Sequence, residues 1–250
     1  MTQSSGLDIQ KPNSYYAAPM GTIADNLKNI QDRIEKAAAK AGRDPAEITL
    51  VAVSKTKPAS MIREAYEAGH RSFGENYAQE MAAKDEELAD LDISWHFIGH
   101  LQRNKAKLVA PVASYVETVD SIRLAEALNS KIDQPLDVLI EVNIGAEETK
   151  SGIREDELPK FLEELQHFDK LSVKGLMIIP PYIPDLEAAR PHFIKLREIM
   201  ERLNEQNIVG SPLTELSMGM SHDFETAIEE GATIVRVGTA IFGERGQHVL

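Results

Sequence analysis

A lysine at the end of an apolar run is the first residue of the chain whose setting suggests chemistry. Residues 48–55 read Ile-Thr-Leu-Val-Ala-Val-Ser-Lys, and Val51, Val53 and Lys55 share one face because side chains alternate along a strand. Partial burial would disfavour the ammonium form of Lys55 and favour the neutral amine, which attacks carbonyl groups. Lys55 is therefore a candidate Schiff-base lysine, and the alternative is a solvated lysine at a strand end. Lys57, directly before Pro58, is the weaker candidate.

Two segments near the end of the chain are rich in small residues. Residues 217–221 read Ser-Met-Gly-Met-Ser, and residues 238–243 read Gly-Thr-Ala-Ile-Phe-Gly. Small side chains let backbone N–H groups approach an anion, and barrels often bind phosphate in the loops after their seventh and eighth strands. The two segments predict a phosphate site, with ordinary turns as the alternative.

Arg236 lies between apolar neighbours in the run Thr-Ile-Val-Arg-Val. A guanidinium there is costly to bury unless it finds an acceptor. Arg236 shares a strand face with Gly238, so it could point at the same ligand as the phosphate segments. The competing interpretation is a structural salt bridge to an inward carboxylate, with Glu75 and Glu141 as the candidates.

Two other groups of polar residues carry weaker signals. His96 and His100 have the four-residue spacing of a helical zinc pair, but they fall on a strand and a loop, with no H-E-x-x-H motif and no third ligand nearby. We expect no metal site, and we expect His100 to form a polar wall of the barrel mouth. The acidic stretch from Lys84 to Asp92 is interpreted as a solvated helix face and turn.

Strand and helix patterns alternate along the chain. Thr22 and Asp25 form a variant of the helix capping box, and apolar residues then recur at three- and four-residue spacing as far as Ala41, before Gly42. A second helix pattern runs from Leu186 to Leu203. Apolar runs that suit parallel strands buried on both faces occur at eight places: residues 48–55, 71–74, 94–98, 113–119, 136–143, 173–179, 213–217 and 233–237.

Eight strands separated by helix-like segments predict an α/β fold, a single (β/α)8 TIM barrel with an extra N-terminal helix. An open doubly wound sheet is the second choice, since no G-x-G-x-x-G follows the first strand and no phosphate-binding P-loop motif occurs. In a barrel the functional residues lie at the carboxyl ends of the strands. Lys55, Asn76, Ser217 and Arg236 all fall at or near such ends.

Composition excludes several classes of function. The 250 residues include no cysteine, so disulfides, thiolate metal sites, iron–sulfur clusters and cysteine nucleophiles are excluded. The net charge of −13 argues against nucleic acid and anionic membrane as partners, and no apolar run is long enough to span a bilayer. Residues 1–21 lack helix or strand periodicity and the pattern of a secretory signal, so we expect a flexible tail, a barrel over residues 22–250 and a cytoplasmic protein.

Six motifs follow one another along residues 22–243: Val51–Pro58, Phe73–Tyr77, Trp95–Gln102, Gly175–Met177, Leu216–Ser221 and Val235–Gly243. In this order they resemble the YggS/PROSC family of pyridoxal phosphate homeostasis proteins. The resemblance implies an alanine-racemase-like barrel of fold type III, which carries pyridoxal 5′-phosphate (PLP) as an internal aldimine.

The resemblance also implies a role for each residue that matches a motif. Lys55 would bond covalently to PLP, and Arg236 would face the pyridine nitrogen. Ser217, Gly238 and Thr239 would hold the phosphate, while Asn76 and Met177 would line the ring site. An always-charged arginine disfavours a protonated pyridine nitrogen, and such a site therefore disfavours transamination and decarboxylation.

Three hypotheses follow. The first, implied by the family, is a non-catalytic PLP carrier and regulator, for which no catalytic residue is expected. Such a protein would be a monomer that meets PLP-dependent apoenzymes only transiently. Its support is that an alanine racemase adds a β-domain for which the residues after Gly243 leave no room. The second is a PLP-dependent amino-acid racemase, with His100 or Tyr77 as the second base. The third is a Schiff-base aldolase without PLP, which fits Arg236 and the phosphate segments less well.

Overall fold

Parallel strands form a closed ring at the centre of the molecule. The computed structural model describes residues 21–145, 151–181 and 183–244, so the predicted tail lies outside the described residues apart from Gly21. The ring runs in the order β4-β3-β2-β1-β9-β8-β7-β5, and pairing between β4 and β5 closes it. Its strands are β1 (Thr49–Val53), β2 (Ser72–Glu75), β3 (Ser94–Phe97), β4 (Tyr115–Val119), β5 (Leu136–Asn143), β7 (Leu171–Met177), β8 (Glu215–Met220) and β9 (Ile234–Val237).

The predicted barrel is therefore confirmed, and each predicted strand is present within three residues of its expected bounds. A short additional strand, β6 (Ile153–Arg154), pairs with β5 and lies outside the ring. Two residues are too few to leave an apolar pattern in the sequence, which is why it was not predicted.

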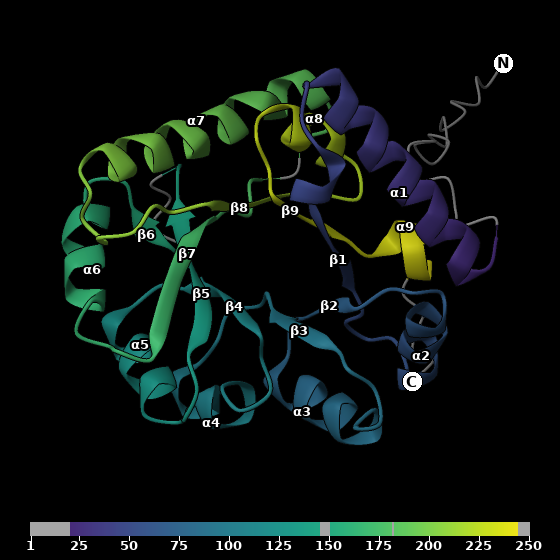
Figure 1. The fold of residues 1–250 in the computed structure, drawn as a ribbon, viewed down its shortest axis with the longest axis horizontal. Coiled ribbons are helices and arrows are strands. Elements are labelled where there is room, and N and C mark those ends of the chain that lie inside the picture. Colours follow the sequence, from purple (N-terminus) through teal and green to yellow (C-terminus); the bar gives the residue numbers. More distant parts are fainter. Residues whose placement is uncertain (1–20, 146–150, 182, 245–250) are drawn as a thin grey trace, which may run out of the picture.

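Helices surround the ring of strands (Figure 1). Those that follow the strands of the first half are α2 (Ala59–Glu67), α3 (Ala78–Glu87), α4 (Ala106–Val109) and α5 (Ile122–Asn129). The second half has α6 (Leu158–Leu165), α7 (Leu186–Glu205), α8 (Phe224–Glu229) and α9 (Thr239–Phe242), and short 3-10 turns occur at η1 (Pro45–Glu47) and η2 (Arg103–Lys105).

The extra helix α1 (Ile23–Lys40) begins as its capping residues predict. The Thr22 hydroxyl accepts a hydrogen bond from the Asp25 N–H at 3.2 Å, and the Asp25 carboxylate accepts one from the Thr22 N–H at 3.0 Å. The apolar stripe of the helix is buried against the barrel next to α8 and α9 (Figure 1). Gly42 follows with a φ of +68°, a conformation that glycine adopts without strain.

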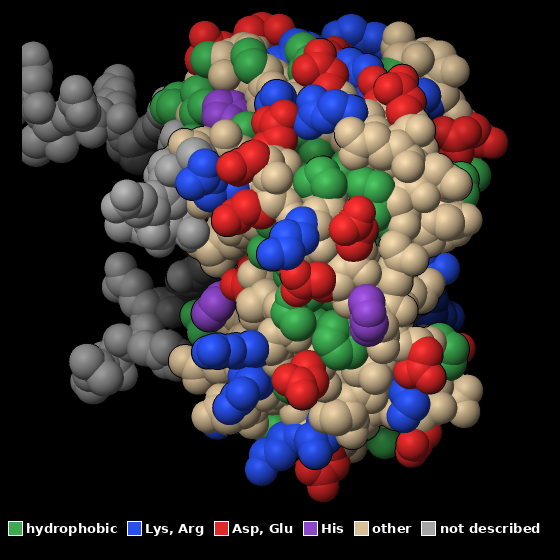
Figure 2. Space-filling model, turned by 90° about the vertical axis from the view of Figure 1, so that its left-hand side faces the viewer, with side chains coloured by type: hydrophobic (Ala, Val, Ile, Leu, Met, Phe, Trp, Pro, Cys, Tyr) green, Lys and Arg blue, Asp and Glu red, His purple; other side chains and the backbone are tan. Residues whose placement is uncertain are grey.

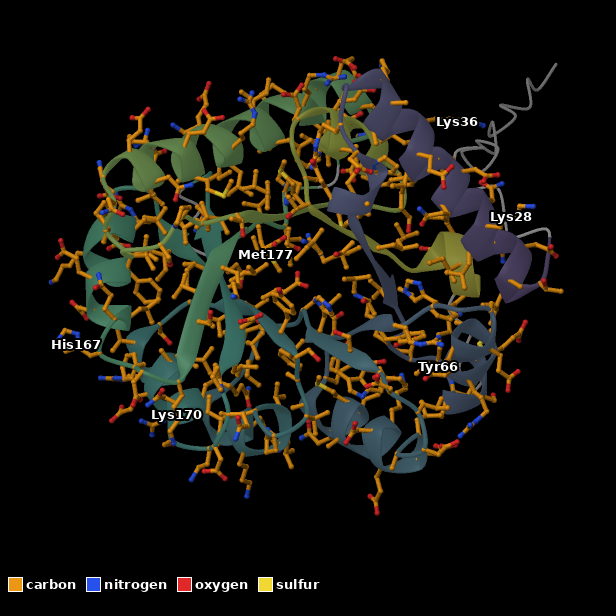
Figure 3. The ribbon with its side chains drawn as sticks, viewed as in Figure 1. Lys28, Lys36, Tyr66, His167, Lys170 and Met177 are labelled. Atoms are coloured by element: carbon orange, nitrogen blue, oxygen red, sulfur yellow. The ribbon has the colours of Figure 1, made fainter. Side chains whose placement is uncertain are left out.

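Side chains fill the inside of the ring as well as the space beneath the helices. Val51, Leu139, Met177 and Ile234 form a buried cluster of their own, separate from the larger core between strands and helices. Figure 3 shows Met177 within the ring. The barrel is thus a packed scaffold, and only its ends can carry a site.

The outer surface is mixed in charge. On the face shown in Figure 2, Lys and Arg side chains alternate with Asp and Glu, without a broad basic region. Glu155, for example, pairs with both Lys195 and Arg202 of α7, at 2.9 and 2.6 Å. Within the described ranges, no helix has the length and apolar character that crossing a membrane requires.

Candidate functional site

A cavity of about 290 Å³ opens where β1, β2 and β9 end. Five of the seven predicted site residues line it: Lys55, Asn76, Arg236, Gly238 and Thr239. They come from parts of the chain up to 184 residues apart (239 − 55), and the parallel ring brings their strand ends to one rim. The remaining lining residues are Val53, Lys57, Ile98, Ile179, Met220, Ser221, His222 and Gly243.

Lys55 lies just beyond β1, on the strand face that the alternation rule predicts. Val51, on that face, belongs to the cluster inside the ring, while Val53 and Lys55 line the cavity above it. The Lys55 side chain is half-buried. Lys55 therefore lines the cavity beside an apolar wall, the setting in which a lysine can serve as a nucleophile toward a carbonyl group.

The turn that follows Lys55 is strained and is held in place from α3. Thr56 has a φ of +63°, unusual for a β-branched residue. Its N–H donates a hydrogen bond to Glu80 at 2.6 Å, and Glu80 also accepts one from Lys84 at 2.7 Å. Helix α3 thus fixes the direction in which Lys55 leaves the strand.

Lys84 is buried, which corrects the expectation that its segment is a solvated helix face. Its ammonium donates hydrogen bonds to the carboxylates of Glu75 and Glu80, each at 2.7 Å, and to the carbonyl oxygen of Ser54 at 2.8 Å. Glu75 also accepts a hydrogen bond from the Ser54 hydroxyl at 2.6 Å. Burial raises the pKa of Glu75, although Lys84 and Ser54 act against that shift. Only the fold could reveal this cluster, because the charge pattern of the segment is that of an exposed helix.

Arg236 is buried inside the ring and has a carboxylate partner. The predicted partners, Glu75 and Glu141, are wrong: the ion pair forms with Glu117 of β4, at 3.9 Å. Ser217 bridges the two groups, since Arg236 Nη1 donates to its hydroxyl at 2.5 Å and that hydroxyl donates to Glu117 Oε2 at 2.5 Å. Arg236 Nη2 also donates to the carbonyl oxygen of Ile178 at 2.7 Å.

Glu117 makes a second contact, to His96 Nδ1 at 2.7 Å. Burial by itself would raise the pKa of Glu117. The hydrogen bond and charge of His96, the charge of Arg236 and the hydrogen bond from Ser217 together outweigh burial. The pKa of Glu117 is therefore lowered. Burial lowers the pKa of Arg236, while the charge of Glu117 acts in the opposite direction. A buried polar chain thus runs through the barrel from His96 to the guanidinium at the cavity wall.

Ser217 and Met177 do not line the cavity. Ser217 is buried and both of its hydrogen bonds are to protein groups, so the structure places it behind Arg236. Met177 belongs to the cluster inside the ring. Position along the strand is the signal that separates the two serines: Ser217 lies within β8, whereas Ser221 follows its end, where barrels carry their functional residues.

The loops after β8 and β9 meet at the cavity. The Gly238 N–H donates a hydrogen bond to the Ser221 hydroxyl at 3.3 Å, and Thr239 lines the cavity beside them. Small side chains and backbone N–H groups in such an arrangement suit an anion such as phosphate.

Asn76 follows β2 and has an unused hydrogen-bonding atom. Its Oδ1 is buried and has no hydrogen-bond partner in the described part of the chain. Gly99 packs against its backbone, because a Cβ at Gly99 would lie 2.2 Å from the Asn76 carbonyl oxygen. The cavity therefore offers an amine, a guanidinium, a side-chain amide and an anion-binding loop, which together suit a small phosphorylated carbonyl compound.

The two predicted second bases lie elsewhere. His100 is exposed and lies 3.4 Å from Asp120, and Tyr77 is 55% exposed; neither lines the cavity. His222 does line it, with Nε2 3.3 Å from the Ile183 carbonyl oxygen. No sequence pattern indicated His222, since it falls beyond β8 in a turn.

Comparison with known proteins finds relatives that match most of the chain. Residues 26–246 match the family model described as alanine racemase, N-terminal domain. A pyridoxal phosphate homeostasis protein from Pseudomonas aeruginosa is 46% identical over 229 residues, which cover 90% of this chain and 97% of the relative.

Solved structures extend the comparison. PipY from Synechococcus elongatus PCC7942, solved with PLP bound, is 36% identical with a TM-score of 0.79, covering 89% of this chain and 100% of that one. An alanine racemase from Corynebacterium glutamicum is 18% identical with a TM-score of 0.66, covering 91% of this chain and 62% of that one. At that identity the racemase is evidence for the shared barrel alone.

Proposed function

Because the chain belongs to the family of pyridoxal phosphate homeostasis proteins, whose barrel matches the alanine racemase N-terminal domain, we propose that it binds PLP and helps to maintain the cellular supply of that cofactor. One observation carries the proposal: Lys55, Arg236 and the loop of Ser221, Gly238 and Thr239 line a single cavity. PLP has an aldehyde, a pyridine nitrogen and a phosphate. Lys55 suits the aldehyde, Arg236 suits the pyridine nitrogen, and the loop of Ser221, Gly238 and Thr239 suits the phosphate.

Each lining residue has a role in this proposal. Lys55 bonds covalently through Nζ to the aldehyde carbon, with loss of one water. Arg236 donates a hydrogen bond toward the pyridine nitrogen, and Gly238 and Thr239 hold the phosphate. Ser221 takes the phosphate role first predicted for Ser217, which acts instead by holding Arg236. Asn76 supplies its unpartnered amide oxygen to a polar substituent of the ring.

The proposal makes the protein a carrier and regulator without catalytic turnover. Relatives that match nearly their whole length to this chain are named homeostasis proteins. Arg236 also supports the proposal: a guanidinium paired with Glu117 keeps positive charge beside the ring nitrogen and disfavours its protonation, which weakens the electron withdrawal that carbanion chemistry needs. We place the protein in the cytoplasm as a monomer with residues 22–250 as its barrel domain, meeting PLP-dependent apoenzymes transiently.

A racemase is the alternative, and His222 is the observation that favours it. Racemisation needs a second base opposite Lys55, and His222 is the imidazole that lines the cavity among the described residues. Assays of amino-acid racemisation with the wild type, Lys55→Ala and His222→Ala would separate the two functions. Turnover that both substitutions abolish would replace the carrier proposal.

The covalent proposal is tested by reduction with borohydride. The protein is saturated with PLP, reduced and digested, and the modified peptide is mapped by mass spectrometry. We expect one pyridoxyl phosphate group on Lys55, none on Lys55→Ala, and unchanged labelling of Lys55 in Lys57→Ala, which alters the other lysine of the same cavity. Labelling of another lysine, or no uptake of PLP, would contradict the proposal.

A further inference from the structure

A second cavity, of about 350 Å³, lies beside the first at the same end of the barrel. Its walls are the end of β5, Ser151, residues 178–181 after β7 and His192 of α7. The two cavities share Ile179, but Lys55, Arg236 and the phosphate loop belong to the first alone. The proposed PLP function leaves this second cavity unused.

Glu141, on the inner face of β5, is a buried carboxylate at the wall of this cavity. Its side chain is only 6% exposed. Oε1 accepts a hydrogen bond from the Ser151 hydroxyl at 2.8 Å, whereas Oε2 has no hydrogen-bond partner within the described residues. An unpartnered buried carboxylate oxygen is costly, so a donor in the cavity would stabilise it.

The surroundings of Glu141 favour a cationic donor. Burial raises the pKa of Glu141, and the charge of Asp120 raises it further. The Ser151 hydroxyl, His100 and Arg236 act in the opposite direction but do not cancel the increase. Arg236 is already bonded to Ser217 and Ile178, and His100 lies 3.4 Å from Asp120. A positive charge on a ligand would therefore offset the repulsion between the carboxylates of Glu141 and Asp120.

The other walls favour a short alkyl chain. Ile144, Ile178, Pro180 and Pro181 contribute apolar surface, while Asn143, Ser151 and His192 contribute polar side chains beside Glu141. Apolar walls with a few polar groups are typical of pockets that orient a small ligand.

We propose that the second cavity binds a small primary amine, with its ammonium group on Glu141 Oε2 and its alkyl chain against the isoleucine and proline walls. Its occupant lies next to the proposed cofactor site, since Ile179 lines both cavities. The site is formed by residues other than those of the PLP proposal, so either proposal can fail without the other.

Three probes of equal chain length test the charge requirement: n-butylammonium, 1-butanol and butyrate. Binding is measured by calorimetry and by ligand-observed NMR, with the wild type and with Lys55→Ala. The lysine variant lacks the amine proposed to hold PLP. Both proteins are freed of PLP before the measurement, so that the amine probe cannot react with the PLP aldehyde. We expect n-butylammonium to bind in both proteins, and the alcohol and the carboxylate to bind at least about tenfold more weakly, the scale of one charge-assisted hydrogen bond.

Glu141→Gln keeps the acceptor for Ser151 but removes the charge, and it should weaken n-butylammonium binding by at least about tenfold. Asp137→Asn is the matched control: Asp137 lies at the other end of β5 and pairs with Lys174 at 3.4 Å, so its loss should leave binding unchanged. Thermal melts confirm that both variants fold. Equal binding of amine and alcohol, equal losses in the two variants, or no binding of the amine would each overturn the proposal.

Discussion

The guanidinium of Arg236 and the carboxylate of Glu117 form an ion pair inside the barrel, 3.9 Å apart, with the Ser217 hydroxyl between them. Arg236 is 4% exposed and Glu117 is fully buried, so neither charge is solvated by water. Each group therefore depends on the other, and the pair sets the position and charge of the arginine at the wall of the PLP cavity.

Glu117→Gln should destabilise the protein by roughly 3–5 kcal/mol, because it leaves a buried guanidinium without its counter-charge. Urea denaturation measures the loss of unfolding free energy. The double variant with Arg236→Gln should be more stable than Glu117→Gln alone, since no uncompensated charge remains. If the loss of unfolding free energy in the double variant equals the sum of the losses in Glu117→Gln and Arg236→Gln measured singly, the two residues are not coupled.

The stabilisation by Glu117 should vanish in acid. Its pKa in the folded protein is lowered from the ordinary glutamate value of about 4.3, so the unfolded chain binds the proton more readily and stability rises with pH between the two values. The stabilisation from Glu117 is complete above the pKa that the group has in the unfolded chain. It is lost as the pH falls through the lower pKa of the folded protein. We expect the stability difference between the wild type and Glu117→Gln to be largest near pH 7 and to shrink below about pH 4.3; a difference that stays constant with pH would contradict this.

Glu80→Ala should weaken PLP retention by about tenfold, because it frees the strained turn at Thr56 that directs Lys55. Glu80→Gln keeps an oxygen for the Thr56 N–H and should retain most of the affinity. Equilibrium dialysis measures retention, and Glu86→Ala, at an exposed position of the same helix, should leave it unchanged. Equal effects of Glu80→Ala and Glu86→Ala would show that the turn does not depend on Glu80.

Ser221→Ala and Ser217→Ala should have different consequences. Ser221 lines the cavity at the phosphate loop, so Ser221→Ala should weaken PLP binding by about tenfold and leave pyridoxal, which lacks the phosphate, nearly unaffected. Ser217→Ala should instead lower stability by about 1–3 kcal/mol, since it leaves Arg236 and Glu117 each short of a hydrogen bond. Competition binding with PLP and pyridoxal, together with denaturation, separates the two roles; loss of pyridoxal affinity in Ser221→Ala would place that serine at the ring.

Much of the fold was predictable from local patterns. Apolar runs located the strands of the ring, Thr22 and Asp25 located the start of α1, and strand alternation placed Lys55 at the barrel mouth. These features depend on residues near one another in the chain, and a period of two or a capping pair is legible from one stretch of sequence.

Contacts between distant segments were decided only by the tertiary structure. Ser217 and Glu117 lie 100 residues apart in the chain, and closure of the ring between β4 and β5 is what brings them together. Packing of α3 beside β2 buried Lys84, and the end of β8 at Met220 placed Ser221 rather than Ser217 at the cavity. A charged residue has no periodicity that reveals its partner, so the sequence identified which groups could do chemistry, while strand register and closure determined which of them meet.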